Sequence, residues 1–322
     1  MNNPLLSICI PTFNRAPFLD ETIKSIVTQK RFYNTNDVEI VISDNSSSDN
    51  TKEIAENYRI KYGNKIRYYC NSENIKDANF EKALSLGKGL FLKLNNDTLN
   101  HVENSLDLII DSIKINIQTK DILFFANGTT RRNKGTLLYK DLNSFVKNVS
   151  FWSTWIACFG IWRDDFNSLH DFSRNAKLQL VQTDVLFRLI SAKKRVYVNN
   201  IKIFMVKNPR NKGGYNFYEV FVTNYLGILR EYVCSKQISR LTYFNEKTKL
   251  LLYHIIPTSL SILKKSDKYS FSFEGSLPIL LNKYRYHPIF YFGLLYFLIR
   301  AIFYFIITHK RNFNEENNKN IP

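Results

Sequence analysis

The chain has 322 residues, of which 44% are hydrophobic and 23% are charged. This suits one large domain, or a domain of about 200 residues with an appendage, and excludes wholesale disorder, collagen-like repetition and a disulfide scaffold. The formal net charge of +17 predicts an anionic partner or an anionic surface. Residues 1–100 hold 13 basic and 12 acidic side chains, whereas residues 201–322 hold 18 and 7, a net +11. We therefore expect the C-terminal part to carry most of the charge.

Short apolar runs alternate with amphipathic helical segments over the first hundred residues. Strands are predicted at 5–10, 38–42, 66–70 and 90–94, and helices at 17–27, after Asn50 as the capping residue, and at 80–86. This alternation is typical of an α/β fold, with a mostly parallel sheet and helices on both faces. Ligands of such sheets bind outside the carboxyl ends of the strands.

Polar clusters follow three of these strands, at 12–15, 44–45 and 95–97. A carboxylate there can hydrogen-bond a base or ribose, hold a divalent cation against phosphates, or act as a general base. Asp44 and Asp97 are candidates for the first two roles, and the alternative for each is a loop-capping Asx turn. No glycine-rich phosphate loop occurs, which disfavours dinucleotide oxidoreductases and P-loop enzymes. Asp97 is thus the best candidate ligand for a metal that neutralises a diphosphate.

Beyond residue 100 the alternation is less regular. Strands are predicted at 121–126 and 154–162, an exposed loop at 131–135, a helix at 178–190 and an edge strand at 196–198. From about residue 216 the pattern is helical, with a break at Pro257. The tail after Lys310 is expected to be disordered.

The cysteines and the first residues of the chain indicate the cellular compartment in which the protein works. Cys9, Cys70, Cys158 and Cys234 lack metal-ligand or Cys-x-x-Cys spacing, so we expect buried thiols in a reducing compartment. The first residues lack the basic segment and the long apolar run of a signal peptide, which favours a cytoplasmic location.

Four segments, in their order and spacing, resemble the signatures of family 2 glycosyltransferases: 7–15 (SICIPTFNR), 38–49 (VEIVISDNSSSD), 74–80 (NIKDANF) and 89–98 (GLFLKLNNDT). These enzymes are inverting, use nucleotide-sugar donors and have the GT-A fold. The resemblance implies a GT-A domain over residues 1–215, followed by a helical C-terminal region over residues 216–322.

The resemblance also implies the donor-binding residues. Asp44 matches the acid that reads the donor base, with Asn45 beside it, and Asp77 and Asn79 match a segment that packs against the nucleotide. The nucleotide-binding loop is matched by Pro11, Thr12, Phe13, Asn14 and Arg15. The Asp-x-Asp motif of the family is matched by Asn95, Asn96 and Asp97. Asn95 replaces the first acid, and Asp97 keeps the carboxylate that would bind Mg²⁺ or Mn²⁺.

The family's catalytic base comes from a later acidic motif at the start of a helix, which residues 182–190 match. Thr183 replaces its first acid, so the resemblance assigns the base to Asp184. The alternative for Asp184 is an acid favoured by the helix dipole, and Asp164 and Asp165 are the other candidates for the base. The base would deprotonate an acceptor hydroxyl, which displaces the nucleotide diphosphate with inversion.

Trp152, Trp155 and Trp162 lie between the metal and base motifs. An aromatic face can stack on a sugar ring, so one of them is a candidate for lining the acceptor site. The alternative is packing in the core.

The segment 288–308 is apolar and aromatic, with Arg300 as its one charge. It is long enough to span a membrane, but Arg300 near its middle and basic residues at both ends disfavour spanning. An interfacial helix on an anionic membrane surface is favoured, with a packed C-terminal helix pair as the other alternative. The family implies a polyprenyl-diphosphate-linked glycan acceptor for O-antigen or capsule, at the cytoplasmic face of the bacterial inner membrane, with peripheral or monotopic attachment.

Two other classes of protein fit parts of the sequence. A nucleic-acid-binding protein fits the basic charge but explains none of the carboxylates at the strand ends, so no nucleic-acid partner is expected. A degenerate, non-catalytic scaffold subunit is prompted by Asn95 and Thr183. The sequence does not specify the sugar, and abequosyl-like, rhamnosyl and galactosyl transfer all fit it.

Overall fold

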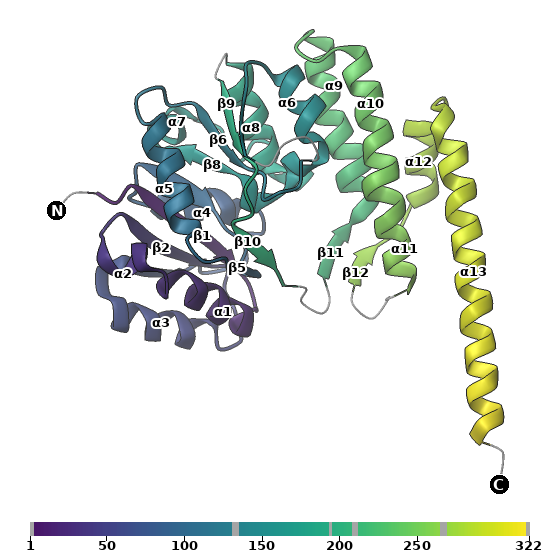
Figure 1. The fold of residues 1–322 in the computed structure, drawn as a ribbon, viewed down its shortest axis with the longest axis horizontal. Helices are drawn as coiled ribbons and strands as arrows, with labels where there is room; N and C mark the ends of the chain where they lie inside the picture. The colour runs from purple at the N-terminus through teal and green to yellow at the C-terminus, as the bar shows by residue number, and fades with distance from the viewer. Residues whose placement is uncertain (1–2, 131–134, 193–194, 208–211, 265–268, 320–322) are drawn as a thin grey trace. The chain divides into compact units, whose positions relative to one another are not determined.

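A computed structural model describes residues 3–130, 135–192, 195–207, 212–264 and 269–319 (Figure 1). The chain divides into two compact units, residues 1–209 with 236–238, and residues 210–235 with 239–322. Of the loop expected at 131–135, residues 131–134 lie outside the described residues.

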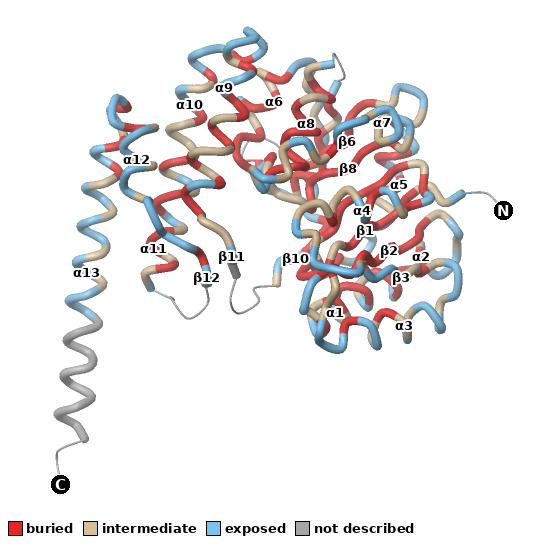
Figure 2. The backbone as a smooth tube through the Cα atoms, turned by 180° about the vertical axis from the view of Figure 1, so that it is seen from behind, coloured by how far each residue is buried: buried red, intermediate tan, exposed pale blue. Residues whose placement is uncertain are grey.

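The main sheet of the first unit has the strand order β3-β2-β1-β4-β8. Its strands are β1 (Leu6–Thr12), β2 (Val38–Asp44), β3 (Ile66–Cys70), β4 (Phe91–Leu94) and β8 (Gly160–Trp162). All neighbours are parallel except β4 and β8. Every residue of β2 is buried, because helices cover both faces of the sheet (Figure 2).

Helices pack on the two faces through opposite sets of side chains. On one face, Leu6, Ile8 and Ile10 of β1 share a core with Leu19 and Ile23 of the first helix. On the other face, α4 packs on β1, β2 and β4. The connecting helices in this part of the chain are α1 (Ala16–Val27), α2 (Lys30–Asn34), α3 (Thr51–Tyr62), η1 (Gly63–Lys65), α4 (Ala78–Leu86) and α5 (Ser105–Asn116). The predicted alternation of strands and helices in residues 1–100 is confirmed. Asn50 precedes α3, but its side chain makes no capping bond.

A smaller sheet in the first unit has the order β6-β9-β7, and β5 pairs with β10 in a separate ribbon. Their strands are β5 (Leu99–His101), β6 (Ile122–Phe125), β7 (Thr136–Tyr139), β9 (Val196–Asn199) and β10 (Phe204–Val206). The prediction of an edge strand at 196–198 is wrong, since β9 lies between β6 and β7. Its partner β7 has a weak apolar pattern and was not predicted.

The strand predicted at 154–162 is wrong for most of its length. The chain forms the short helical turns η2 (Ser150–Thr154) and η3 (Ile156–Cys158) before β8 begins at Gly160. Local hydrogen bonds favour the turns, because Thr154 Oγ1 donates to Phe151 O at 2.7 Å and Cys158 N to Trp155 O at 3.0 Å. A short apolar run cannot reveal such turns by its periodicity. The remaining helices of this unit are α6 (Leu142–Val149), α7 (Arg163–Ser168), η4 (Ala176–Leu178) and α8 (Val181–Ser191).

The second unit is mostly helical. Its elements are β11 (Lys212–Asn216), η5 (Glu219–Tyr225), α9 (Leu226–Cys234), α10 (Arg240–Leu250), η6 (Leu251–Ile255), α11 (Ile256–Lys264), β12 (Tyr269–Ser272), α12 (Ser276–Tyr284) and α13 (Pro288–Lys319). The break predicted at Pro257 is wrong, because α10, η6 and α11 follow one another without a gap. The π-helical turn η6 ends at Ile255, two residues before Pro257, and such turns accommodate a proline within a helix.

Helix α13 contains the apolar segment. Among the described residues, Pro288–Ile307 is the one helix long and apolar enough to cross a membrane, with a mean hydropathy of 2.0, and 17% of its most apolar stretch is buried. The helix continues to Lys319, into the tail expected to be disordered.

The cysteines are only partly as expected. Cys9 and Cys158 are buried, but Cys70 and Cys234 are exposed, and all four are free thiols. Cys70 ends β3 at the edge of the main sheet, where its side chain reaches solvent.

Candidate functional site

The predicted polar clusters meet at one edge of the main sheet. Strand β1 lies between β2 and β4, where the strand order reverses, and open α/β sheets bind ligands at such a position. Thr12 lies opposite Asp44 in the parallel register. Asn95 N donates to Cys9 O at 2.8 Å, which holds the 95–97 segment against β1.

Asp97 is buried at this edge between a hydroxyl and a guanidinium. Its Oδ2 accepts from Thr12 Oγ1 at 2.9 Å, and its Oδ1 lies 3.0 Å from Arg15 Nη1. Burial raises the pKa of Asp97, and Arg15 and Thr12 oppose that rise. The Arg15 side chain is 39% exposed, so its guanidinium faces both the carboxylate and solvent. The exposed N–H groups of the Arg15 guanidinium can donate to an anionic ligand.

The two asparagines before Asp97 have different surroundings. Asn95 Oδ1 lies 3.1 Å from His101 Nε2, and His101 Nδ1 lies 3.1 Å from Ser105 Oγ. Burial, and secondarily the charge of Lys93, lowers the pKa of His101 to about 3. His101 is therefore neutral, and because Asn95 Oδ1 can only accept, the proton lies on Nε2. Asn96 Oδ1 is buried without a hydrogen-bond partner among the described residues.

Sequence reasoning missed His101. It lies on β5, four positions after Asp97, and fixes the orientation of Asn95. Its closeness to the 95–97 motif is the one signal in the sequence that points to this role.

Asp44 is fully buried and uses both carboxylate oxygens. Oδ1 accepts from Ser47 N at 3.0 Å, and Oδ2 accepts from Tyr68 OH at 2.8 Å. The first contact is the loop-capping arrangement that the sequence allowed as an alternative. Burial, followed by Asp44 itself, raises the pKa of Tyr68, so its hydroxyl remains a donor to the acid.

Asn45 and Asn79 make hydrogen bonds that hold the end of β2 and the loop before α4 in place. Asn45 Nδ2 donates to Asn74 Oδ1 at 2.7 Å, and Asn45 Oδ1 accepts from Ile75 N at 2.9 Å. Asn79 is buried and exchanges hydrogen bonds with Ser43, receiving from its hydroxyl at 2.6 Å. These contacts make both asparagines structural parts of the edge.

Asp77 lies directly before α4 and does not cap it by a side-chain bond. The carboxylate is half-buried, and burial raises its pKa to about 6. No hydrogen bond to it is found among the described residues, which leaves this acid available to a ligand.

The loop after β1 is tied to the loop after β2. Asn14 has a left-handed backbone with φ of 51°, and its Oδ1 accepts from Ser48 N at 2.8 Å. Pro11 is half-buried in β1 opposite Ser43. The Phe13 side chain is 42% exposed and can offer an aromatic face to a base or sugar.

Asp184 lies at the start of α8, buried within a cluster of cations. Its Oδ1 accepts from Arg174 Nη2 at 2.8 Å and Asn175 Nδ2 at 3.0 Å. Its Oδ2 accepts from Arg174 Nε at 3.1 Å and lies 3.0 Å from Arg188 Nε. Three of the roughly four lone-pair sites of the carboxylate are therefore hydrogen-bonded, and Arg188 adds a charge beside Oδ2 without a hydrogen bond from its Nε. Arg174 makes two of these three bonds, so its withdrawal would open both carboxylate oxygens to an acceptor hydroxyl.

The other candidate acids differ from Asp184 in exposure. The side chain of Asp164 is 74% exposed and lies 3.5 Å from Lys120 Nζ. Asp165 follows it in the same short helix, α7.

The three tryptophans differ in burial and in their contacts. Trp162 is buried in the core and donates to Asp121 O at 2.7 Å, as the packing alternative predicts. Trp152 is 37% exposed and its ring lies 6.3 Å from that of half-buried Trp155. Gln182 and Thr183, next to Asp184, hydrogen-bond Thr154 O at 2.6 Å and Ser153 O at 3.3 Å. The exposed tryptophan segment and Asp184 are thus neighbours.

No three His, Cys, Asp or Glu side chains gather to hold a metal anywhere in the part of the chain that the structure describes. Two candidate oxygen donors for a metal in the 95–97 segment are the Asp97 carboxylate and Asn96 Oδ1, which has no hydrogen-bond partner among the described residues. Mg²⁺ commonly binds one or two carboxylates and takes other oxygens from substrate phosphates. The donor set therefore fits a metal that arrives with a diphosphate, and such a metal would compete with Arg15 for Asp97.

Residues 7–166 match the family model Glycosyl transferase family 2. The chain is 44% identical over 86 residues to abequosyltransferase RfbV of Salmonella typhimurium, covering 26% of this chain and 25% of that protein. It is 37% identical over 97 residues to the GalNAc(5)-diNAcBac-PP-undecaprenol beta-1,3-glucosyltransferase of Campylobacter jejuni, covering 29% of each. The matches thus span between a quarter and a third of these relatives.

Solved structures confirm the GT-A fold. The mannosyltransferase PcManGT from Pyrobaculum calidifontis, in complex with GDP-Man and Mn²⁺, superposes with a TM-score of 0.54 at 13% identity, covering 94% of this chain and 87% of that one. TarS 1-349 of S. aureus, in complex with UDP-GlcNAc, superposes with a TM-score of 0.53 at 15% identity, covering 80% and 78%.

Proposed function

The chain carries a glycosyl transferase family 2 domain in residues 7–166, and from this premise we propose that it transfers a sugar, with inversion, from a nucleotide-sugar to a lipid-linked glycan. The observation that carries the proposal is the Thr12–Asp97–Arg15 cluster, which lies where the strand order reverses. It places a cation and a carboxylate where α/β sheets bind nucleotides.

The donor binds at the edge formed by the loops after β1, β2 and β4. Phe13 and Asp44 lie toward the base, Asp77 and Asn79 toward the nucleotide, and Arg15 toward the diphosphate. The exposed guanidinium of Arg15 suits an anion, since arginine binds phosphate oxygens with two parallel donors. Solved proteins of this fold hold GDP-Man or UDP-GlcNAc.

A divalent Mg²⁺ or Mn²⁺ would be held by Asp97, with Asn96 as a second oxygen donor. When bound, the metal stabilises negative charge that grows on the leaving diphosphate. Asn95 helps to hold the 95–97 segment in place, because His101 fixes the orientation of its amide. In the absence of a metal, Arg15 supplies the compensating charge to Asp97.

Asp184 acts as the general base. Withdrawal of Arg174, whose side chain is 38% exposed, frees an oxygen of the carboxylate. That oxygen takes the proton of an acceptor hydroxyl, whose oxygen forms a bond to the anomeric carbon from the face opposite the diphosphate. The bond between the anomeric carbon and the diphosphate breaks, and its electron pair leaves with the nucleotide. Trp152 supports the acceptor sugar by stacking.

The acceptor is a glycan on a polyprenyl diphosphate, in the assembly of a surface polysaccharide such as O-antigen or capsule. The Campylobacter relative is named for a diphospho-undecaprenol acceptor, and the Salmonella relative for abequose transfer. An acceptor of this kind lies in a membrane, and α13 exposes an apolar aromatic surface that suits the interface. We place the protein at the cytoplasmic face of the inner membrane, attached peripherally or monotopically.

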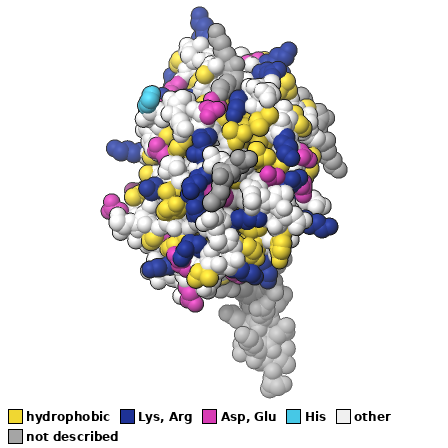
Figure 3. All heavy atoms as spheres, turned by 90° about the vertical axis from the view of Figure 1, so that its left-hand side faces the viewer, with side chains coloured by type: hydrophobic (Ala, Val, Ile, Leu, Met, Phe, Trp, Pro, Cys, Tyr) yellow, Lys and Arg dark blue, Asp and Glu magenta, His cyan; other side chains and the backbone are white. Residues whose placement is uncertain are grey.

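On the face of the protein in Figure 3, the described Lys and Arg side chains are interspersed with acidic and apolar ones. They form no continuous basic stripe on this face of the kind that tracks a nucleic-acid backbone.

A thermal-shift panel tests the proposal. UDP-, GDP-, CDP- and dTDP-sugars are each added with and without Mn²⁺, and a ligand of the native state raises the melting temperature. The stabilising donor, in radiolabelled form, should then pass its sugar to a polyprenyl-diphosphate acceptor and make the label extractable into organic solvent. A panel in which no donor raises the melting temperature contradicts the proposal.

A further inference from the structure

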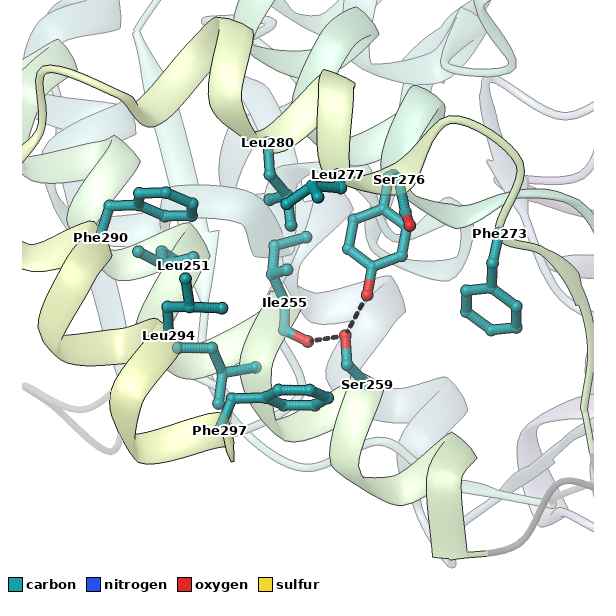
Figure 4. A pocket seen from close by; sticks show the side chains of 12 residues that line it. Leu251, Ile255, Ser259, Phe273, Ser276, Leu277, Leu280, Phe290, Leu294 and Phe297 are labelled. Carbon is teal, nitrogen blue, oxygen red and sulfur yellow. Dashed lines mark hydrogen bonds between the residues drawn. The ribbon is translucent and has the colours of Figure 1, made fainter. Parts of the chain in front are cut away.

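The second unit contains a cavity that the proposed reaction does not use. It has a volume of about 330 Å³ and lies among η6, α11, α12 and α13 (Figure 4). Six of its apolar lining residues are Leu251, Ile255, Leu280, Phe290, Leu294 and Phe297. Its size falls at the lower end of the roughly 300–1,000 Å³ of ligand pockets.

The chemistry of the lining suits a hydrocarbon. Tyr218 OH and Ser259 Oγ lie 2.8 Å apart, and Ser259 Oγ donates to Ile255 O at 2.7 Å, as the dashed lines in Figure 4 show. These two hydroxyls therefore satisfy each other and the backbone. Ser276 is the further polar lining residue and is half-buried. A ligand with many polar groups would find few partners here.

The cavity adjoins an exposed apolar surface. Leu277 lines it and is 54% exposed, and Leu281 follows one turn later on α12. Along α13, Leu295, Leu298 and other apolar side chains are exposed beside the lining residues Leu294 and Phe297. A water-insoluble chain could thus reach the cavity from a lipid phase without crossing a polar rim.

Cations lie beyond one end of the cavity. Phe290, a lining residue, stacks on Tyr284 with ring centroids 5.9 Å apart. Lys247 Nζ lies 5.0 Å from the Tyr284 ring centroid and donates to Lys283 O. Arg285 follows Tyr284 and covers the exposed ring of Tyr286.

These cations are not neutralised by neighbouring acids. Within the described ranges, Lys247, Lys283 and Arg285 form no ion pair, and the nearby carboxylate of Glu246 accepts from Tyr225 OH at 2.9 Å. Burial and the charge of Lys283 lower the pKa of Lys247, as expected where cations gather without an anion.

We propose that the cavity binds isoprene units of a polyprenyl diphosphate, whose phosphates contact Lys247, Lys283 and Arg285. The inference rests on the proposed function, because the lipid-linked acceptor supplies this ligand. The three cations match a diphosphate better than the single phosphate of a phospholipid. The cavity has room for part of the chain, and the remainder would lie along α13.

Photolabelling of the full chain in detergent micelles tests the site. The probe is farnesyl diphosphate with a diazirine on its terminal isoprene unit, and labelled peptides are identified by mass spectrometry. We expect labels on η6, α12 and α13 at lining residues, reduced at least fivefold by excess farnesyl diphosphate and unchanged by phosphatidylglycerol. Labels elsewhere, or equal competition by phosphatidylglycerol, overturn the proposal.

Two kinds of variant distinguish binding of the isoprenoid chain in the cavity from binding of the phosphates by the cations. Leu280→Trp fills the cavity and should lower labelling at least fivefold, whereas Leu241→Trp, at an exposed position of α10 outside the lining, should leave it unchanged. The double variant Lys283→Glu, Arg285→Glu should lower labelling by the diphosphate probe but not by the matching diazirine farnesol. Melting temperatures show whether each variant folds, and Leu277→Trp is the second cavity-filling variant if Leu280→Trp does not.

The two proposals fail differently. If the lining is labelled as expected but no donor supports transfer, the proposed function fails and the cavity assignment stands. If transfer to the lipid-linked acceptor is intact in Leu280→Trp and the wild-type lining takes no label, the cavity assignment fails and the function stands.

Discussion

Thr12 joins the two acids of the sheet edge. It lies opposite Asp44 in the register of β1 and β2, and its hydroxyl donates to Asp97 at 2.9 Å. The position of Asp97 is therefore set by a residue of the central strand rather than by its own loop alone. The hydrogen bond holds the loop after β4 against the sheet, which suits a site that must keep a diphosphate in one place.

Thr12→Val should weaken donor binding while the protein stays folded. Valine has a similar shape but leaves one oxygen of buried Asp97 without its hydrogen-bond donor. Such an unsatisfied buried group costs about 1–3 kcal/mol of folding stability. That loss should appear in the free energy of unfolding, and titration calorimetry should show a higher donor Kd because the carboxylate is no longer held in position. Thr12→Ser should retain most of the affinity, and Thr28→Val, exposed at the end of α1, is the control. Unchanged affinity in Thr12→Val would remove Thr12 from the donor site.

Asp97→Asn should abolish the effect of metal on donor binding. The amide keeps the shape of the side chain but lacks the charge that binds Mg²⁺ or Mn²⁺. In thermal-shift titrations, Mn²⁺ should add to donor stabilisation in the wild type and not in the variant. Asp111→Asn, an exposed position on α5, controls for the general loss of a negative charge. If EDTA leaves wild-type donor binding and turnover intact, the metal proposal is wrong and Arg15 is the remaining source of positive charge.

Asp184→Asn should reduce turnover by about 10²–10⁴-fold, the usual contribution of a general base. Donor binding should persist, because the sheet edge is unchanged. The substitution leaves Arg174 and Arg188 facing a neutral side chain, so the melting temperature should fall as well.

Asp171→Asn is the matched control for Asp184. Asp171 pairs with the same Arg188 at 2.6 Å but is 56% exposed. It should keep the wild-type rate. Loss of turnover in both variants would show that Asp184 acts through its ion pairs and not as the base, and wild-type rates in both would exclude Asp184 as the base.

The strands and the sheet edge could be predicted because their signals are local. The run 38–42 is apolar apart from Glu39, which indicates a strand buried on both faces, and Asp44 and Asp97 each follow such a run within three residues. The pairing of Asp184 with Arg174 could not be predicted, since the ten-residue separation has no helical or strand period. The contact of His101 with Asn95 depends on how β5 turns back, which only tertiary structure defines.

The errors have a common cause. The chain continues helically through Pro257 because a π-helical turn precedes it, and β9 is central because β7 pairs with its free side. In both cases a long-range or irregular contact overrides a local preference.

The exposed face of α13 should determine membrane binding. Phe292 and Phe303 are 72% and 60% exposed, and replacing both with Glu puts negative charge where apolar rings would enter an anionic interface. Flotation with phosphatidylglycerol vesicles should show at least about a tenfold loss of binding, since one such charge costs on the order of 1.4 kcal/mol or more in apolar surroundings. Ile60→Glu, on α3, changes an equally exposed apolar residue and should float as the wild type does. Equal flotation of the double variant would place the membrane contact elsewhere.

Lys93 should make stability rise with pH just above neutrality. Its ammonium is buried in β4, donates to Ala157 O at 2.6 Å and lies 4.9 Å from the centre of the Phe204 ring. Burial lowers the pKa of Lys93 from 10.5 to about 7. Between these values the unfolded chain binds more protons, so the free energy of unfolding rises by up to about 1.4 kcal/mol per pH unit.

The useful window for Lys93 is pH 7 to about 8.5, because burial also raises the pKa of the Cys9 and Cys158 thiols. Those thiols ionise first in the unfolded chain, which lowers stability at higher pH. In urea unfolding, Lys93→Met should flatten the rise and be more stable than the wild type below pH 7, because methionine requires no desolvated charge. Lys114→Met, an exposed position on α5, should keep the wild-type slope. A Lys93→Met slope equal to the wild-type slope would mean that Lys93 stays protonated in the folded protein across this range.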